Sequence, residues 1–560
     1  MGDTHFDVVI VGSGFGGSVM AYRLAEAGLR VCVLERGKAY PPGSFPRSPF
    51  KLKENFWDPS KGLHGMFNIW GFENMGAVVS SGLGGGSLIY ANVLIRKPEE
   101  YFIKEDVNKG GWEYWPVTRA ELDPHYDQVE TMMNAQRYPL DHAPYSSTRK
   151  TLATKEAAAQ LNLDWHLPKL AVTFANPNAT PVPGVPIIGG ENNLHGLPRS
   201  TCRLCGECDI GCNYGSKNTL DYTYLSAAKR AGADIRTRCE VRTFEPFTNG
   251  GARYRISYVD HAEGERRGVP SSKLEPVTIT ANRLVLAAGT FGSTYLLLKN
   301  RASFPGVSDK LGTRFSGNGD LLTLVFEAKN KQGQPRILDG SFGPVITSAI
   351  HGKDALEGGK GRGFYVEDAG YPDFVNWIME TSNQPGFIIR GLKLGWRILM
   401  GWLGLDKDAD LGEEISKFLG PTTLSSTFLP LLTMGRDVPD GRMYLSKKGF
   451  LELDWKEYRS KPYVEDARAT LKKIAAAIGG TYVPDPVEFL KKLITVHPLG
   501  GCPMGRNTSE GVVDSYGEVF NHPGLYVMDG AVMPGPVGPN PSLTIAAVSN
   551  RAAEHIIETR

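Results

Sequence analysis

The pattern of apolar and polar positions near the start of the chain predicts a strand, a helix and a second strand. Residues 6–11 are an apolar, largely β-branched run, as expected of a strand that is buried on both faces. Apolar residues at helical spacing follow between Val19 and Ala25, and a second apolar run covers residues 30–34. We therefore predict a βαβ unit with two parallel strands.

Two later apolar runs predict further strands of the same sheet. Residues 284–288 turn at Gly289 into a helical pattern, and residues 525–528 end in Asp529 and Gly530. Taken alone, residues 284–288 are also consistent with an ordinary βα unit. Asp529 taken alone is also consistent with an acid that caps a turn. Strands that return to one sheet after long excursions indicate a long cofactor that lies across several strand ends. Together the two runs favour FAD over a nicotinamide dinucleotide.

The turn after the first strand reads Gly-Ser-Gly-Phe-Gly-Gly at residues 12–17. Gly12 would permit a tight turn, Gly14 would let the backbone approach a pyrophosphate, and Gly17 would let helix and strand pack closely. The first N–H groups of the helix would face the phosphates. Glu35, at the end of the second strand, would accept hydrogen bonds from the ribose hydroxyls. We predict a dinucleotide site at this end of the sheet.

A second glycine cluster reads Gly-Leu-Gly-Gly-Gly-Ser-Leu at residues 82–88. Without Cβ atoms such a loop can lie against a flat ring system and offer N–H groups to it. A flexible linker is the alternative, which the apolar residues 88–94 disfavour. Gly84, Gly85 and Ser87 are therefore candidate cofactor contacts.

A histidine and an asparagine near the end of the chain are the candidate catalytic groups. His497 follows an apolar run, residues 489–496, and precedes Gly500-Gly501, which permits close backbone approach. Asn540 and Pro541 precede a helical pattern that extends to residue 552, so Asn540 also qualifies as an N-cap with Pro541 at the first helical position. A satisfied loop histidine and a capping asparagine are the structural alternatives.

Charge and composition narrow the class of protein. A net charge of +2, from 62 basic and 60 acidic residues, argues against nucleic acid as a partner. The first strand begins too early to leave room for a secretory signal. The longest apolar stretch, residues 387–405, contains Arg390, Lys393 and Arg397, so we do not expect a membrane span and expect a cytoplasmic protein.

Residues 387–405 allow two interpretations. The three basic residues share one helix face, and Leu392 and Trp396 lie elsewhere around the helix, a pattern typical of a helix on a membrane surface. A cap helix that packs on its own domain would show the same pattern. The first interpretation predicts peripheral membrane contact. Both favour a hydrophobic pocket, and hence a sterol or long-chain alcohol over a sugar.

Cys202, Cys205, Cys208 and Cys212 have the spacing C-x2-C-x2-C-x3-C. Such a run holds iron–sulfur clusters in ferredoxins, where a proline follows the fourth cysteine. Asn213 follows here, and the chain has no second run of this kind. An iron–sulfur cluster and a tight loop leading to residues 217–219 near the cofactor both remain open.

Five segments of the chain resemble, in family order, the glucose–methanol–choline (GMC) oxidoreductases, and within them the cholesterol oxidase branch. These segments are residues 12–17 with Glu35, 82–88, 284–293, 497–502 and 525–547. The resemblance implies an α/β fold in which a Rossmann-like FAD-binding domain, discontinuous in sequence, adjoins an α+β substrate-binding domain built on a mainly antiparallel sheet. We expect the FAD-binding domain to comprise residues 1–99, 195–319 and 484–560, and the substrate-binding or cap domain to comprise residues 100–194 and 320–483.

The resemblance also implies roles for single residues. His497 would accept the proton of an alcohol while hydride passes to flavin N5, and Asn540 would orient the substrate oxygen. Glu367 would take the place of a glutamate that moves protons on a steroid ring, although a solvated acid at a strand end is the alternative. Tyr90 departs from the family pattern, which has an Asn beside the flavin, and Asn92 is its expected substitute. The remaining expected cofactor contacts are Val241, Gly289, Asp529, Gly530, Asn540 and Pro541.

We therefore expect FAD-dependent oxidation of a hydrophobic alcohol, with O2 or another electron acceptor as the second substrate. A flavin-containing lyase similar to the hydroxynitrile lyases of the family is the alternative from another class. A flavin-binding protein without activity is disfavoured, because both His497 and Asn540 are present in their motifs.

Overall fold

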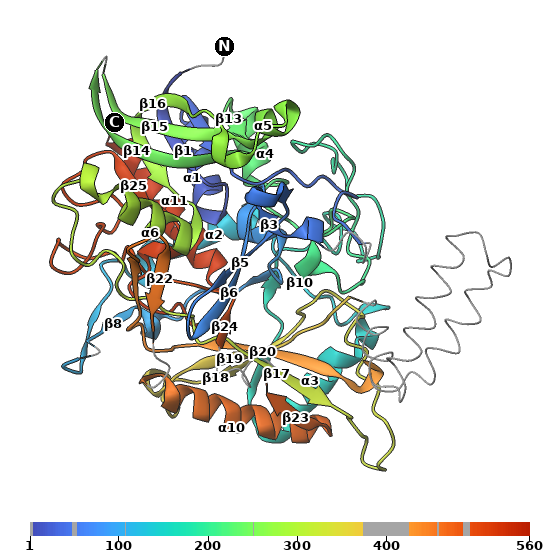
Figure 1. Cartoon of the computed structure of the whole chain (residues 1–560). Coiled ribbons are helices and arrows are strands. Elements are labelled where there is room, and N and C mark those ends of the chain that lie inside the picture. Colours follow the sequence, from blue (N-terminus) through green and yellow to red (C-terminus); the bar gives the residue numbers. More distant parts are fainter. Residues whose placement is uncertain are drawn as a thin grey trace, which may run out of the picture.

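The computed structural model describes residues 4–47, 53–106, 108–249, 251–372, 425–455, 459–484 and 493–559. Two large sheets organise it, one close to the chain termini and one close to helices α3 and α10 (Figure 1). The stretch for which we weighed a membrane-surface helix, residues 387–405, lies outside the described residues. No helix within those ranges is long and apolar enough to cross a lipid bilayer.

The first sheet has seven strands and contains the predicted βαβ unit. Its strand order is β13-β2-β1-β16-β15-β14, and β25 pairs with β16. The parallel strands are β1 (His5–Val11), β2 (Val31–Leu34), β13 (Asp234–Arg236), β16 (Val277–Leu286) and β25 (Leu525–Val527). Two antiparallel strands, β14 (Cys239–Asn249) and β15 (Ala252–Asp260), extend it beyond β16. The predicted return of distant segments to one sheet is confirmed.

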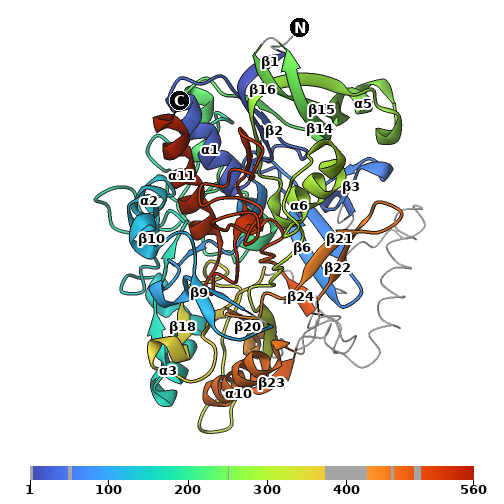
Figure 2. The ribbon, with the colours of Figure 1, turned by 90° about the vertical axis from the view of Figure 1, so that its left-hand side faces the viewer.

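Side chains of β1 are buried on both faces of this sheet, as its apolar run predicts. Val8 and Ile10 share a core cluster with residues of α1 (Phe15–Glu26) and α11 (Ser542–Glu558). Val9 and Val11 belong to another cluster, which includes Leu297 of α6 (Gly289–Asn300). Figure 2 shows α1 and α11 side by side, away from α6. The first and last helices therefore pack together on one face of this sheet.

The second sheet has six strands, all antiparallel, which confirms the expected architecture of the substrate-binding part. Its order is β11-β18-β19-β20-β17-β23. The strands are β11 (Asp164–His166), β17 (Leu321–Phe326), β18 (Ala349–Gly352), β19 (Phe364–Asp368), β20 (Leu429–Gly435) and β23 (Thr481–Pro484). Helices α3 (Arg149–Leu161) and α10 (Lys461–Ile478) share a core with it. The domain boundaries given above stay a prediction.

Strand β19 turns its two faces to different environments. Phe364 and Val366 pack in the core with α3 and α10. Because side chains of a strand alternate between faces, Tyr365 and Glu367 lie on the opposite face. A small sheet of β5 (Phe67–Gly71), β6 (Met75–Ser80) and β24 (Leu493–Thr495) lies between the two large sheets (Figure 1). Strand β24 leads directly to His497.

Candidate active site

The first glycine turn has the predicted geometry. Gly12 has a φ of +100°, and a Cβ added there would lie 2.3 Å from the carbonyl oxygen of Ala287. A Cβ at Gly17 would lie 2.1 Å from the carbonyl oxygen of Gly12. Gly14 is the N-cap of α1, and a Cβ on it would meet no atom of the described residues within 4 Å. The helix start, with its outward N–H groups, therefore has room for a pyrophosphate.

Glu35 holds this turn in place. Its carboxylate accepts hydrogen bonds from the backbone N–H of Ser13 (3.0 Å), the Ser13 hydroxyl (2.6 Å) and the backbone N–H of Gly37 (2.8 Å). An ionised carboxylate offers about four lone-pair positions. One position is thus left for a ribose hydroxyl, which keeps the predicted ribose contact available.

The second glycine cluster is a fixed wall of the same site. A Cβ at Gly85, where φ is +51°, would lie 2.6 Å from the Cα of Gly14. The Ser87 hydroxyl donates to the Gly84 carbonyl (2.7 Å) and accepts from the backbone N–H of Leu220 (3.0 Å). These contacts favour the predicted cofactor wall over a flexible linker.

Asn92 carries the clearest sign of a missing partner. It is fully buried with a φ of +72°, and neither polar atom of its amide has a hydrogen-bond partner among the described residues. A buried, unsatisfied polar group costs about 1–3 kcal/mol, so this amide is expected to face a bound polar group. Tyr90 instead donates its hydroxyl to the Asn218 carbonyl (3.1 Å). Asn92 rather than Tyr90 therefore fits the polar edge of a flavin.

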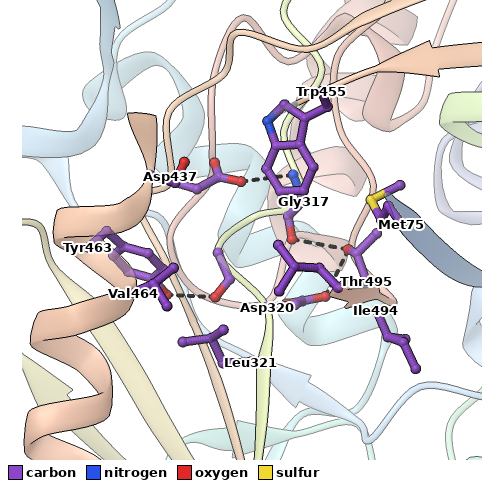
Figure 3. Close-up of a pocket in the computed structure, with 13 residues that line it drawn as sticks. Met75, Gly317, Asp320, Leu321, Asp437, Trp455, Tyr463, Val464, Ile494 and Thr495 are labelled. Atoms are coloured by element: carbon purple, nitrogen blue, oxygen red, sulfur yellow. Dashed lines mark hydrogen bonds between the residues drawn. The ribbon is translucent and has the colours of Figure 1, made fainter. Parts of the chain in front are cut away.

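His497 is held by a carboxylate that the sequence analysis did not select. Its Nδ1 lies 2.8 Å from Oδ1 of Asp320, and the imidazole is only 15% exposed. The other carboxylate oxygen accepts from the Thr495 hydroxyl (2.9 Å) and from the backbone N–H groups of Val496 (2.8 Å) and His497 (3.1 Å). Asp320 and Thr495 are seen together in Figure 3. Because the carboxylate accepts the Nδ1 proton, Nε2 is left as the basic nitrogen.

Asn540, in the loop before helix α11, lies beside Glu367 on strand β19 of the second sheet. The Asn540 amide donates to Oε2 of Glu367 at 3.4 Å. Helix α11 begins at Ser542, and its N-cap is Pro541. The sequence predicts Asn540 as the N-cap and Pro541 as the first helical residue, so both positions are one residue too early. Asn540 therefore has no capping role. Glu367 is fully buried, and burial raises its pKa to about 8. Within the described chain, Oδ1 of Asn540 and Oε1 of Glu367 have no hydrogen-bond partner, so both are available to a bound molecule.

One short segment, residues 316–320, joins the loops of His497 and Asn540; we call it the connecting turn. Asp320 at its end binds residues 495–497, as described above. The Asn318 side chain accepts from the backbone N–H groups of Val537 (2.9 Å) and Gly538 (3.0 Å) and donates to the carbonyls of Gly538 (3.3 Å) and Pro539 (3.1 Å). The two candidate residues are therefore fixed to the same piece of backbone.

The remaining predicted contacts lie around the ends of the first sheet. Gly289 has a φ of +79° at the start of α6. Asp529 accepts from the backbone N–H of Ala531 (2.8 Å) and the Ser293 hydroxyl (2.5 Å), so it does cap a turn, and its burial raises its pKa to about 6. Gly530 accepts at its carbonyl from the backbone N–H of Gly500 (2.9 Å). Val241 lies on β14, whose first residue donates its backbone N–H to the Glu35 carbonyl (2.8 Å). Their cofactor contacts stay predictions.

The cysteine run does not fit an iron–sulfur cluster. Across the described ranges, no three His, Cys, Asp or Glu side chains are arranged to hold a metal ion. Lys217 instead ties the run to the glycine-rich wall, because its ammonium donates to the carbonyls of Cys208 (2.8 Å) and Leu88 (3.0 Å). The tight-loop alternative agrees with this geometry.

Comparison of the sequence with known proteins shows the family of this chain. Residues 6–303 and 450–549 match the two family models of the GMC oxidoreductases. A cholesterol oxidase of Mycobacterium tuberculosis is 32% identical over 98% of this chain and 90% of its own length. The chain belongs to the GMC oxidoreductase family. This family binds FAD, and the chain is an FAD-dependent alcohol oxidoreductase.

Other relatives of this GMC oxidoreductase span nearly all of the chain. A cholesterol oxidase of Acinetobacter baumannii is 28% identical over 98% of this chain and 94% of the relative. The long-chain-alcohol oxidase FAO4B of Arabidopsis thaliana is 23% identical over 99% of this chain and 67% of the relative. The solved structure of pyridoxine 4-oxidase from Mesorbium loti, 16% identical, covers 98% of both chains with a TM-score of 0.55, which shows a shared fold.

Proposed function

We propose that this enzyme oxidises the hydroxyl group of a sterol or long-chain alcohol to the carbonyl compound, with His497 as the proton acceptor. The observation that carries the proposal is the buried Asp320 carboxylate at 2.8 Å from Nδ1 of His497. A carboxylate in this position sets the imidazole tautomer and leaves Nε2 to accept a proton. The apolar substrate class is supported by the relatives named cholesterol oxidase and long-chain-alcohol oxidase.

The residues of this chain would have the following roles in the reaction. FAD, when bound, supplies the acceptor for the hydride that leaves the carbinol carbon. His497 takes the hydroxyl proton at Nε2, and Asp320 stabilises the resulting imidazolium without itself taking the proton. The amide of Asn540 hydrogen-bonds to the substrate oxygen and fixes the carbinol carbon in place. Gly14, Glu35, Gly85 and Asn92 are the residues that would hold the cofactor.

Anaerobic titration tests the proposal directly. The holoenzyme is mixed without oxygen with cholesterol, with a fatty alcohol, and with glucose and choline as controls, and the flavin absorbance is followed. We expect bleaching with the sterol or the fatty alcohol and not with the controls. Admission of air then separates an oxidase, whose absorbance returns, from a dehydrogenase that needs another acceptor. Equal bleaching with glucose or choline would reject an apolar substrate, and turnover with an unbleached flavin would indicate a lyase.

We further propose that Glu367 carries a proton between ring carbons when the product is an unsaturated ketone. Its free Oε1, its contact with Asn540 and its burial support this role. A carboxylate in an apolar site is a stronger base than one in water, because burial disfavours its charged form. With a pKa of about 8, Glu367 gains and loses its proton within the pH range in which enzymes work.

Glu367→Gln should abolish the carbon-to-carbon proton transfer and spare most of the alcohol oxidation. In the wild type this transfer should become faster as pH rises toward about 8, because only the ionised carboxylate accepts the proton. The measurement is the ratio of the two ketone products, by chromatography, across pH. A variant that still rearranges the double bond would contradict the proposal.

The same substitution has a stability consequence with a defined sign. Glu367 ionises near 4.5 in an unfolded chain and near 8 in the folded one, so unfolding releases a proton between these values. Wild-type stability should therefore fall relative to the Gln variant as pH rises from about 4.5 to about 8, and the difference should stay constant above that. Thermal unfolding of both proteins across this range measures it.

A further inference from the structure

We propose that Asp437 is a positioning residue that aligns His497 with Asn540 by holding the connecting turn, residues 316–320. The inference rests on the proposed roles of His497 and Asn540 in alcohol oxidation. Asp437 follows β20 and is 1% exposed. No hydrogen bond among the described residues joins its carboxylate to either of these two residues, so it would act through the turn.

The connecting turn holds both loops at once. Asp320 accepts four hydrogen bonds from residues 495–497. Asn318 makes four with residues 537–539, directly before Asn540. Ser316 adds a backbone pair with Leu499, with N···O distances of 3.0 and 2.9 Å. A shift of this turn would therefore move the imidazole and the amide together.

The connecting turn has a tight backbone conformation that lies close to helix α10. Asn318 and Gly319 have consecutive positive φ values of 54° and 68°. Asparagine and glycine adopt this left-handed region more readily than other residues, so both suit a tight turn, and the contacts of the turn hold it in this one conformation. A Cβ at Gly319 would also lie 2.5 Å from the Tyr463 hydroxyl, so the turn approaches α10 closely.

Asp437 anchors the first half of the connecting turn. Its carboxylate accepts from the Ser316 hydroxyl (2.5 Å) and the backbone N–H of Gly317 (2.9 Å). The Ser316 oxygen in turn accepts from the backbone N–H of Asn318 (3.0 Å). On the other side, the Tyr463 hydroxyl donates to the Gly319 carbonyl (2.7 Å), and Figure 3 shows Asp437 and Tyr463 at the two ends of the turn. Hydrogen bonds to an ionised carboxylate are stronger than those between neutral groups.

A small cavity borders one side of the connecting turn. Gly317, Gly319 and Asp320 line a small cavity, which Asp437 also lines (Figure 3). Side chains from α10, β6 and β24 complete its wall, among them Val464, Met75 and Ile494. Where the turn borders this cavity, it has fewer van der Waals partners than in a fully packed core. Hydrogen bonds restrain it there: those of Asp437 and Tyr463, that of the Thr495 hydroxyl to the Gly317 carbonyl (3.0 Å), and that of the Gly435 N–H to the Asn318 carbonyl (2.8 Å).

The test compares Asp437→Asn and Asp437→Ala with Asp454→Asn, which removes the same charge from an exposed position nearby on β22 (Leu451–Asp454). Hydrogen exchange is measured at the backbone amides of Val496, His497, Val537 and Gly538 in the FAD-loaded enzymes. We expect both Asp437 variants to speed exchange at both loops by about tenfold or more, and Asp454→Asn to leave it unchanged. Asn318→Gly, which removes the side-chain amide and keeps a residue suited to the positive φ, should speed exchange at residues 537–538 and leave residues 496–497 near their wild-type rates.

Flavin reduction under anaerobic single-turnover conditions gives the functional half of the test. We expect the rate constant to fall by about tenfold in Asp437→Asn and further in Asp437→Ala, with unchanged FAD content. If the Ala variant does not fold, the near-isosteric Asn variant decides both measurements. Wild-type exchange at either loop, or altered exchange with wild-type flavin reduction, would overturn the inference. A wild type that reduces its flavin with none of the alcohols would refute the proposed function, and the exchange data would still decide whether Asp437 holds the two loops.

Discussion

Replacing His497 by glutamine should slow alcohol-dependent flavin reduction by about a thousandfold. General acid–base catalysis contributes roughly 10²- to 10⁴-fold to enzymatic rates, and glutamine offers no group that accepts a proton at neutral pH. The amide can still donate from its nitrogen to Asp320, so the carboxylate keeps a partner in the position now taken by Nδ1. The measurement is stopped-flow bleaching of the flavin under anaerobic conditions at saturating alcohol.

FAD content and thermal stability are the controls for the His497 variant. No hydrogen bond of the described residues joins the His497 side chain to the glycine-rich cofactor loops, so FAD should remain bound at the wild-type ratio. A variant that reduces its flavin at more than a tenth of the wild-type rate would show that another group takes the proton.

Asp320→Asn should cost about a hundredfold in the same assay. An amide that turns its NH2 group toward Nδ1 would stabilise the opposite imidazole tautomer, with the proton on Nε2, where it cannot accept the substrate proton. The loss of the negative charge also removes the stabilisation of the imidazolium. The equivalent change in a serine-protease triad lowers kcat by about 10⁴-fold, which sets an upper limit for this one.

Thr495→Val is the matched control for Asp320→Asn. It removes the Thr495 hydroxyl, which donates to Asp320 and the Gly317 carbonyl and accepts from the backbone N–H of His497, and it leaves the carboxylate against the imidazole. We expect a change of less than about fivefold in flavin reduction, because the tautomer and the charge are both retained. Equal losses in the two variants would indicate that Asp320 supports only the loop, and that its charge is not used.

Much of the flavin-binding half could be predicted because its signals are local in sequence. The glycine turn, Glu35 and the apolar strands each follow from steric and burial rules that act over a few residues. Even Gly12 and Gly17 make the close backbone contacts that their positions imply. The edges of elements were less well defined: strand β16 begins at Val277, seven residues before the run that predicts it, and α11 begins one residue late.

The support of His497 could not be predicted, since Asp320 lies 177 positions away in the chain. In sequence, residues 316–320 read Ser-Gly-Asn-Gly-Asp, an ordinary turn before an apolar strand. Only the folded chain brings this turn against residues 495–497 and 537–539. The sequence does contain one signal. Asp320 stands directly before a buried strand and directly after Gly319, and an acid in such a position is a candidate for holding another loop.

The cysteine run shows the opposite case, in which spacing suggested chemistry that the fold does not support. Cys202 belongs to the core cluster of Val345 and Ile346, and Cys208 packs against that same cluster. Being close together is not enough, because no three His, Cys, Asp or Glu side chains of the described ranges are arranged to hold a metal ion. The spacing of cysteines in the sequence does not by itself bring four thiolates to one point, which cluster binding requires.

The pairing of β16 with β1, β15 and β25 has a consequence for how such an enzyme can diversify. The nucleotide sheet is completed by strands from the beginning, the middle and the end of the chain, and most strands of the second sheet lie in the long interval between β16 and β25. Changes in that interval can reshape the chamber that receives the alcohol without altering the order of the strands that cradle the dinucleotide. Relatives that oxidise dissimilar compounds can accordingly keep one redox platform and exchange the enclosure above it.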